Sequence, residues 1–217
     1  MTPVELFFDC SCVWAYIGIA HFERVVAPHA APLILRPVNM AELFRHVNRS
    51  ALEPQAEVRT RYFARDVEEW AYFLDLPLVD PARTPNPSES CMRACVAAGR
   101  QGRMRPFAEA CFEAAWLNGR ELTDPEVIAD AWARAGLPAG LLREELAATG
   151  AATVLDANTR ELMARGGFGV PTFAFGSDLF FGADSVPLLE LQVRRRLKGI
   201  GQNHHNQGVS ACFQEIC

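Results

Sequence analysis

The sequence predicts an α/β fold in which two sheet-forming ends are separated by a long all-helical insertion. β-branched and aromatic runs typical of buried strands occur near both ends of the 217-residue chain. From about residue 58 to residue 166, apolar residues instead recur at helical spacing, with few strand signals. With 50% hydrophobic residues, a chain of this length can bury a sizeable core.

The first part of the chain predicts a strand, a helix and a second strand. The run VELFF at 4–8 has no helical period and is typical of a buried strand. Helical spacing follows over 13–26, until Pro28 ends it. The run LILRPV at 33–38 is the second strand. Such a unit forms a right-handed crossover, so we expect the two strands to be parallel.

The middle of the chain predicts a succession of helices. Thr123-Asp124-Pro125-Glu126 shows a typical helix start, with a capping side chain, an early proline and an acid in the first turn. We expect helices over 58–74, 88–101, 104–118, 124–135, 138–148 and 152–165.

The strand signal returns after Gly166. Runs at 171–175 and 179–182, separated by a short glycine-containing loop, predict a hairpin. A last helix is expected over 185–198, where its basic residues favour a helix C-terminus. The predicted division of the chain is an N-terminal βαβ part at 1–45, a helical insertion at 46–160, a C-terminal ββα part at 161–199 and a flexible tail at 200–217.

Charge and composition exclude several classes of function. A net charge of −5 argues against a nucleic-acid-binding surface, which needs clustered Lys and Arg. No segment reaches the roughly 18 apolar residues of a membrane span, and no secretory signal is recognised, so we expect a cytoplasmic protein without membrane contact. Seven cysteines is an odd number, which favours reduced thiols over a disulfide framework.

Two cysteines lie where the first strand meets the first helix, in FFDCSCVWAYIG at 7–18. Cys12 falls at the helix N-terminus, a position that favours a thiolate and so predicts a nucleophile at neutral pH. Cys10 lies on the strand side, where we expect it to pack; the alternative is that both are small buried residues. No metal site is expected, because a C-x-C pair without further ligands nearby does not complete a zinc shell. Cys91, Cys95 and Cys111 are interpreted as core residues.

Gly169-Val170-Pro171-Thr172 places a proline at the start of a strand, although proline donates no ladder hydrogen bond. A cis Val170–Pro171 bond that exposes the Val170 backbone to a ligand is one explanation. An ordinary edge-strand proline is the other, and the residues alone leave both open.

Taken together, these motifs resemble a known family. The chain is similar to the disulfide-oxidoreductase-A-like branch of the thioredoxin fold, and more narrowly to kappa-class glutathione transferases and 2-hydroxychromene-2-carboxylate isomerases. The resemblance implies a thioredoxin-like domain interrupted by the helical insertion. The matching pieces, in the order of the family, are VELFFDCSCVWAYIG (4–18), LRPVNMAELFRHVN (35–48), RYFARDVEEWA (61–71), ELTDPEV (121–127), GGFGVPTF (166–173) and LFFGADSVPLLE (179–190).

The resemblance also implies a glutathione site. Cys12 stands where the family has a serine that contacts the glutathione sulfur, and the backbone of Val170 would pair with the cysteinyl part of the tripeptide. Val13, Ala183 and Ser185 depart from the family's proline, serine and arginine. The expected glutathione-binding residues are Val13, Trp14, Asn48, Val170, Pro171, Ala183 and Asp184, of which Ala183 and Asp184 would hold the γ-glutamyl end.

The activity implied by the resemblance is that of a glutathione-dependent isomerase acting on an aromatic or unsaturated carbonyl substrate, in a homodimer. Ala15 stands in the place of a second motif cysteine, so a C-x-x-C disulfide is excluded. A monothiol thiol–disulfide oxidoreductase that uses Cys12, a glutathione transferase that conjugates electrophiles and a binding module without activity stay open. An aromatic substrate pocket would draw on Trp14, Tyr16, Phe44, Tyr62, Trp70 and Trp116, although each is also a typical core residue.

Overall fold

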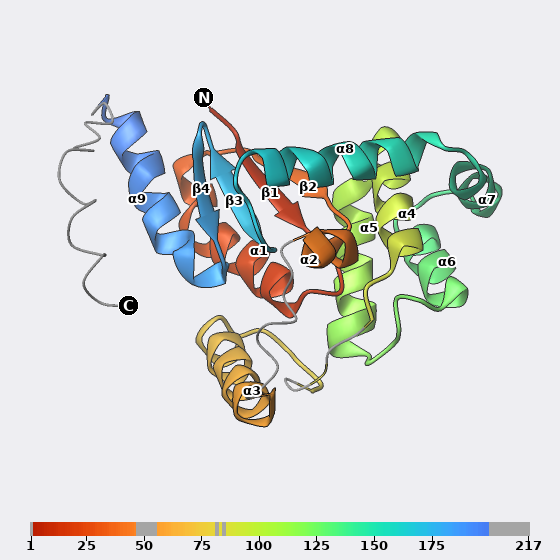
Figure 1. Cartoon of the computed structure of the whole chain (residues 1–217), viewed down its shortest axis with the longest axis horizontal. Coiled ribbons are helices and arrows are strands. Elements are labelled where there is room, and N and C mark those ends of the chain that lie inside the picture. The colour runs from red at the N-terminus through yellow and green to blue at the C-terminus, as the bar shows by residue number, and fades with distance from the viewer. Residues whose placement is uncertain (1, 47–55, 81–82, 84–85, 200–217) are drawn as a thin grey trace.

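A computed structural model describes residues 2–46, 56–80, 83 and 86–199. Its centre is a four-stranded sheet with the order β2-β1-β3-β4 (Figure 1). β1 (Val4–Phe8) runs parallel to β2 (Leu33–Pro37), which confirms the predicted crossover. β3 (Thr172–Phe175) is antiparallel to β1 and forms a hairpin with β4 (Asp178–Phe181), as predicted.

Helices account for most of the remaining described chain. Where the structure describes the chain between β2 and β3, its regular elements are all helical, so the predicted helical insertion is confirmed (Figure 1). The helices are α1 (Val13–Val25), α2 (Met40–His46), α3 (Ala56–Phe73), α4 (Glu89–Arg100), α5 (Met104–Phe112), α6 (Pro125–Arg134), α7 (Ala139–Ala147), α8 (Gly150–Ala164) and α9 (Val186–Leu197). Three short segments complete them, the 3₁₀ turns η1 (Ala27–His29) and η4 (Ala183–Ser185) and the π-helical η3 (Glu113–Leu117).

Successive side chains of β1 point to opposite faces of the sheet. Leu6 and Phe8 belong to the larger core cluster, together with residues of α1, α4 and α5. Phe7 points to the other face, where it packs with Leu43 of α2 and Leu162 of α8. Helices therefore cover both faces, which explains why the strands are apolar runs rather than alternating ones.

Two elements differ from the sequence-based expectation. α2 was not predicted, because a seven-residue helix has little periodicity and is marginal alone. It is held by the side chain of Asn39, which accepts a hydrogen bond from Glu42 N at 3.1 Å, and by burial of Met40 and Leu43. The helix expected over 104–118 instead changes to π-helical geometry at Glu113.

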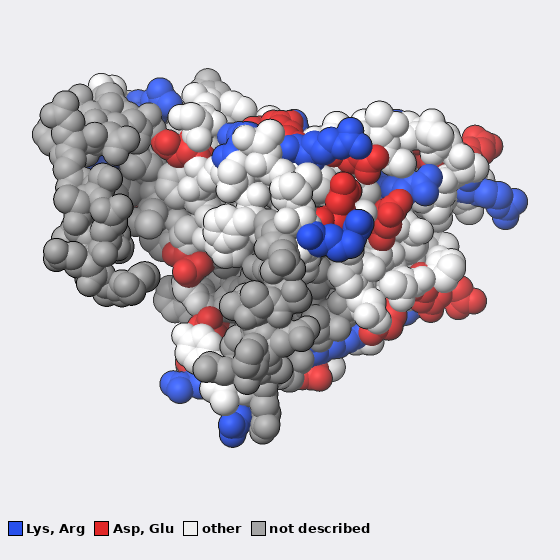
Figure 2. Space-filling model, in the orientation of Figure 1, with Lys and Arg blue, Asp and Glu red and all other residues white. Residues whose placement is uncertain are grey.

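Charges of both signs are interleaved over the face seen in Figure 2, without a large field of one sign among the described residues. Within the described part of the chain, none of the helices combines the length and the apolar character needed to cross a bilayer.

Candidate active site

The loop that joins β1 to α1 is shaped by a buried carboxylate. Asp9 Oδ1 accepts hydrogen bonds from Ser11 N at 2.9 Å and from Ser11 Oγ at 2.7 Å. Its Oδ2 accepts from Met40 N at 3.3 Å, which ties the loop to the start of α2. Burial raises the pKa of Asp9, and the hydrogen bonds from Ser11 and Met40 offset this only in part. Asp9 thus fixes the backbone of the loop that carries Cys10 and Cys12.

Cys12 is the N-cap residue of α1, as the sequence predicts. Its extended backbone and the bond from Ala15 N to Cys12 O at 3.0 Å mark the beginning of the helix. The side chain makes no capping hydrogen bond to the helix, so it remains directed to the neighbouring loop. There the Cys12 thiol donates to the carbonyl oxygen of Val170 at 3.4 Å. The thiol is partly exposed, at the positive end of a helix dipole.

The loop that faces Cys12 contains a cis peptide bond between Val170 and Pro171, so the cis alternative is the one that the structure adopts. α1 approaches this loop closely because residue 18 is glycine. A Cβ at Gly18 would lie 3.3 Å from Cζ of Phe173 and 3.4 Å from Cγ of Pro171. The small residue therefore sets the distance between the helix that carries Cys12 and the proline loop.

Ala183 and Asp184 follow β4 and are tied to the same region. Gly182 N donates to Pro171 O at 2.9 Å, and Nδ1 of the buried His21 donates to Ala183 O at 2.9 Å. Ala183 is buried, whereas Asp184 is exposed. Gly182 has a positive φ of 90°, and a Cβ there would collide with the Asp184 carboxylate. The glycine thus leaves room for that carboxylate beside the proline loop.

Asp66 of α3 is a charged residue that the sequence analysis did not single out. Burial raises the pKa of Asp66, and the negative charge of Asp184 raises it further. Two neighbouring carboxylates favour a bound cation such as an ammonium group. No sequence signal indicates this electrostatic interaction, because the two residues are far apart in the chain and lie on different elements.

The remaining residues predicted to bind glutathione are Val13, Trp14 and Asn48. Val13 is buried in the first turn of α1, and the ring of Trp14 packs edge-on against Phe63 of α3 at 5.7 Å. Asn48 lies outside the described residues. The structure therefore brings Cys12, Val170 and Pro171 into direct proximity and ties Ala183 to the same loop.

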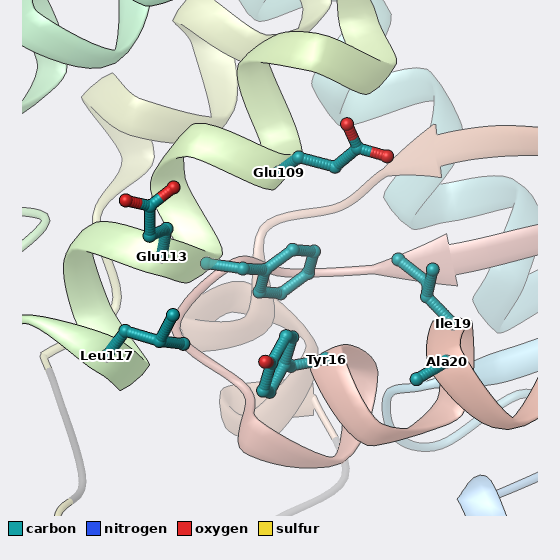
Figure 3. A pocket seen from close by; sticks show the side chains of 7 residues that line it. Tyr16, Ile19, Ala20, Glu109, Glu113 and Leu117 are labelled. Carbon is teal, nitrogen blue, oxygen red and sulfur yellow. The ribbon is translucent and has the colours of Figure 1, made fainter. Parts of the chain in front are cut away.

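A pocket of about 290 Å³ lies between α1 and the α5–η3 segment (Figure 3). One of its lining residues, Tyr16, follows Cys12 by one turn of α1. The Tyr16 and Phe112 rings are 5.8 Å apart, and Ile19, Ala20 and Leu117 complete the apolar lining. Two carboxylates, Glu109 and Glu113, stand at its edge and are paired with Arg105 and Arg134.

Tyr16 is the predicted aromatic residue that this pocket uses. Burial, together with the charge of Glu113, raises the pKa of the Tyr16 phenol, which keeps it protonated at neutral pH. The indole of Trp116 is instead buried and donates to Cys10 O at 3.2 Å. Tyr62 is 69% exposed, so it is not part of a core or of this pocket.

Cys10 behaves as predicted and packs in the core with no exposed surface. The Cys111 and Cys91 thiols lower the pKa of Cys10, but contact with Cys95 and burial outweigh them and raise it to about 11. Cys10 is therefore a neutral thiol at physiological pH, and Cys12 is the partly exposed sulfur of the pair.

Comparison with known proteins agrees with this architecture. A family model described as DSBA-like thioredoxin domain matches residues 3–194. A 2-hydroxychromene-2-carboxylate isomerase of Pseudomonas putida is 21% identical over 193 residues, 88% of this chain and 94% of the relative.

Solved structures share the fold. A 2-hydroxychromene-2-carboxylate isomerase structure has a TM-score of 0.74 at 20% identity, covering 92% of this chain and 99% of the other. A cytosolic disulfide reductase, DsbM of Pseudomonas aeruginosa, solved with GSH, has a TM-score of 0.60 at 20% identity, with 88% of this chain and 99% of the other covered.

Proposed function

Because the chain belongs to the DSBA-like thioredoxin domain family, we propose that it is a glutathione-dependent isomerase of an aromatic or unsaturated carbonyl substrate. The observation that carries the proposal is the Cys12 thiol at the N-terminus of α1, 3.4 Å from the carbonyl that precedes cis-Pro171. The similarity to relatives named 2-hydroxychromene-2-carboxylate isomerase supports the reaction, and the DsbM structure with GSH supports the cofactor.

The proposed reaction interconverts the two geometries of a carbon–carbon double bond. A thiolate adds to the β-carbon of the unsaturated carbonyl compound, and the π electrons move to the carbonyl oxygen as an enolate. Rotation about the resulting single bond follows. The enolate then re-forms the double bond and expels the thiolate, so no net oxidation occurs. The pocket beside Tyr16 supports an aromatic substrate, because it is apolar and lined by two rings.

Glutathione would lie along the proline loop in this proposal. The backbone of Val170 would pair with its cysteinyl part, and Val13, Trp14 and Pro171 would line the peptide. Ala183 and Asp184 would hold the γ-glutamyl end, with Asp66 adding a second carboxylate for its ammonium group. The exposed Asp184 carboxylate, for which Gly182 leaves room, supports this orientation.

Turnover of a hydroxychromene-type carboxylate by dialysed protein, with and without glutathione, tests the proposal. If the glutathione thiolate attacks, Cys12→Ser should keep turnover, because a hydroxyl is a stronger hydrogen-bond donor to that thiolate than a thiol is. If Cys12 attacks, Cys12→Ser should lose it, because a serine hydroxyl is a far poorer nucleophile at neutral pH. Cys10→Ala is the matched control and should keep the rate of the wild type. Absence of glutathione-stimulated turnover on any such substrate contradicts the proposal.

A monothiol thiol–disulfide oxidoreductase is the second candidate function. It is favoured by the presence of a partly exposed cysteine where serine suffices for isomerisation, and by the likeness to DsbM. The Cys12 thiolate would attack the glutathione sulfur of a disulfide between substrate and glutathione, so that the substrate leaves as a thiol and Cys12 holds glutathione as a mixed disulfide. A second glutathione thiolate would then attack that glutathione sulfur, which frees Cys12 and releases glutathione disulfide. Reduction of a mixed-disulfide substrate that is lost in Cys12→Ser, without isomerase turnover in the wild type, would favour this function.

The glutathione site is tested separately through Asp184. Asp184→Asn keeps the shape of the side chain but removes the charge that would bind the γ-glutamyl ammonium. We expect the dissociation constant of glutathione to rise about tenfold, a loss of about 1.4 kcal/mol, by calorimetry. Asp130→Asn, a change on α6 in an exposed ion pair with Arg120, should leave that constant unchanged. Equal affinity in both variants would remove Asp184 from the site.

A further inference from the structure

Three buried cysteines from distant parts of the sequence converge behind the active-site loop. The Sγ atoms of Cys10, Cys91 and Cys111 all lie within 4.8 Å of one another, and Cys91 Sγ and Cys111 Sγ are 3.6 Å apart. The three residues come from the loop after β1, from α4 and from α5, and each is at most 1% exposed. The thioether of Met92 lies next to this group, because its Sδ accepts a hydrogen bond from Cys10 N at 3.4 Å.

The positions of these sulfurs are fixed by neighbouring groups. Trp116 Nε1 donates to Cys10 O at 3.2 Å, and Ser88 Oγ accepts from Cys91 N at 3.1 Å as the N-cap of α4. Backbone anchoring of this kind is what orients the ligands of a metal site. The cluster is therefore held in place without any contribution from a disulfide.

We propose that Cys10, Cys91 and Cys111 form a binding site for one thiophilic metal ion, and that the ion is Cu(I). With a metal–thiolate distance of about 2.3 Å, a trigonal site has sulfur–sulfur edges of about 4.0 Å. The observed edges, 3.6 Å for one pair and at most 4.8 Å for the others, approach this value. Thiolate and thioether ligands are those that soft Cu(I) prefers.

The choice of Cu(I) follows from the number and kind of the ligands. Zn²⁺ in a structural site takes four tetrahedral ligands, and the described residues supply three thiols within mutual reach, without a nearby histidine. Each thiol that becomes a ligand releases one proton to solvent, and copper enters and stays as Cu(I), so no electron is transferred.

The test uses full-length protein in which Cys12, Cys212 and Cys217 are changed to serine, so that these three sulfurs do not compete for the ion. Cu(I), supplied anaerobically as its acetonitrile complex against a chromophoric chelator, should bind at one ion per chain. The melting temperature should rise, because the ion binds the folded state. X-ray absorption should show about three sulfur neighbours near 2.3 Å.

Ligand variants decide the assignment. Cys91→Val and Cys111→Val, made separately so that either serves if the other does not fold, should each weaken Cu(I) binding at least about tenfold. Val96→Ala, a buried change on the same helix as Cys91 that removes no sulfur, is the control and should bind Cu(I) as tightly as the parent protein does.

Other outcomes would overturn the site. Binding that lowers the melting temperature would show that copper captures thiols of the unfolded chain. Unchanged affinity in both valine variants would place the ion elsewhere. Tighter binding of Zn²⁺ with four sulfur neighbours would reject Cu(I) as the ion.

Discussion

Asp9 is buried at the junction of β1, α1 and α2, and its charge state should influence the stability of the whole loop. Its pKa is raised above the ordinary value of 3.8, so the folded state binds its proton more tightly than the unfolded state does. The stability contributed by that proton is fully present below about pH 3.8 and is lost as the pH rises through the higher folded-state pKa.

Asp9→Asn tests this reasoning. Asparagine keeps an acceptor for Ser11 but does not titrate, and it loses the bond from Met40 N at a cost of about 0.5–1.5 kcal/mol at every pH. Relative to the wild type, the variant should therefore gain stability between pH 4 and pH 7, as measured by urea unfolding. Glu121→Gln should show the opposite dependence of unfolding free energy on pH, because the hydrogen bond from Arg83 lowers the pKa of Glu121. A difference between wild type and Asp9→Asn that does not change with pH would contradict the raised pKa.

At the scale of elements, the contact between α1 and the proline loop decides where Cys12 lies. That contact depends on Gly18, because even a Cβ there would lie 3.3 Å from the ring of Phe173, closer than an ordinary van der Waals contact. The packing of α1 thus places Cys12 against a loop that is remote in sequence.

Gly18→Val should disturb this arrangement. A branched side chain must displace Pro171 or Phe173, so we expect a loss of about 1–3 kcal/mol in the free energy of unfolding and weaker glutathione binding. Gly140→Ala is the matched control, since a Cβ there meets nothing within 4 Å and alanine favours a helix by up to about 1 kcal/mol. Chemical denaturation and calorimetry on both variants measure the effect. Gly18→Val with wild-type stability and affinity would show that the contact does not position the site.

At the scale of the molecule, the active-site loop lies between the sheet and the helical insertion. The insertion reaches the loop through Trp116, and α8 is tied to the sheet by Arg165, which binds Glu5 at 2.9 Å. Arg36 of β2 also contacts Glu5, at 3.3 Å, and pairs with Glu161 of α8. The apolar pocket likewise lies between the two parts of the chain, because α1 and the α5–η3 segment both line it. That this chain forms a homodimer stays a prediction.

The sequence by itself determined the elements whose signals are local. Apolar runs gave the strands, helical periodicity gave the long helices, and the position of Cys12 between a strand and a helix marked it as an N-cap thiol. The sequence does not predict α2, because so short a helix depends on packing rather than on periodicity. The π-helical turn at Glu113 has no signature in the pattern of apolar residues.

Only the tertiary structure decided which residues meet. It selected the cis form of Val170–Pro171 and placed the Val170 carbonyl against Cys12. It also joined Cys10 to Cys91 and Cys111, which the sequence separates by 81 and 101 positions (91 − 10 and 111 − 10). The physical reason is that periodicity reports which face of an element is buried, whereas the partners on that face are set by how the elements pack.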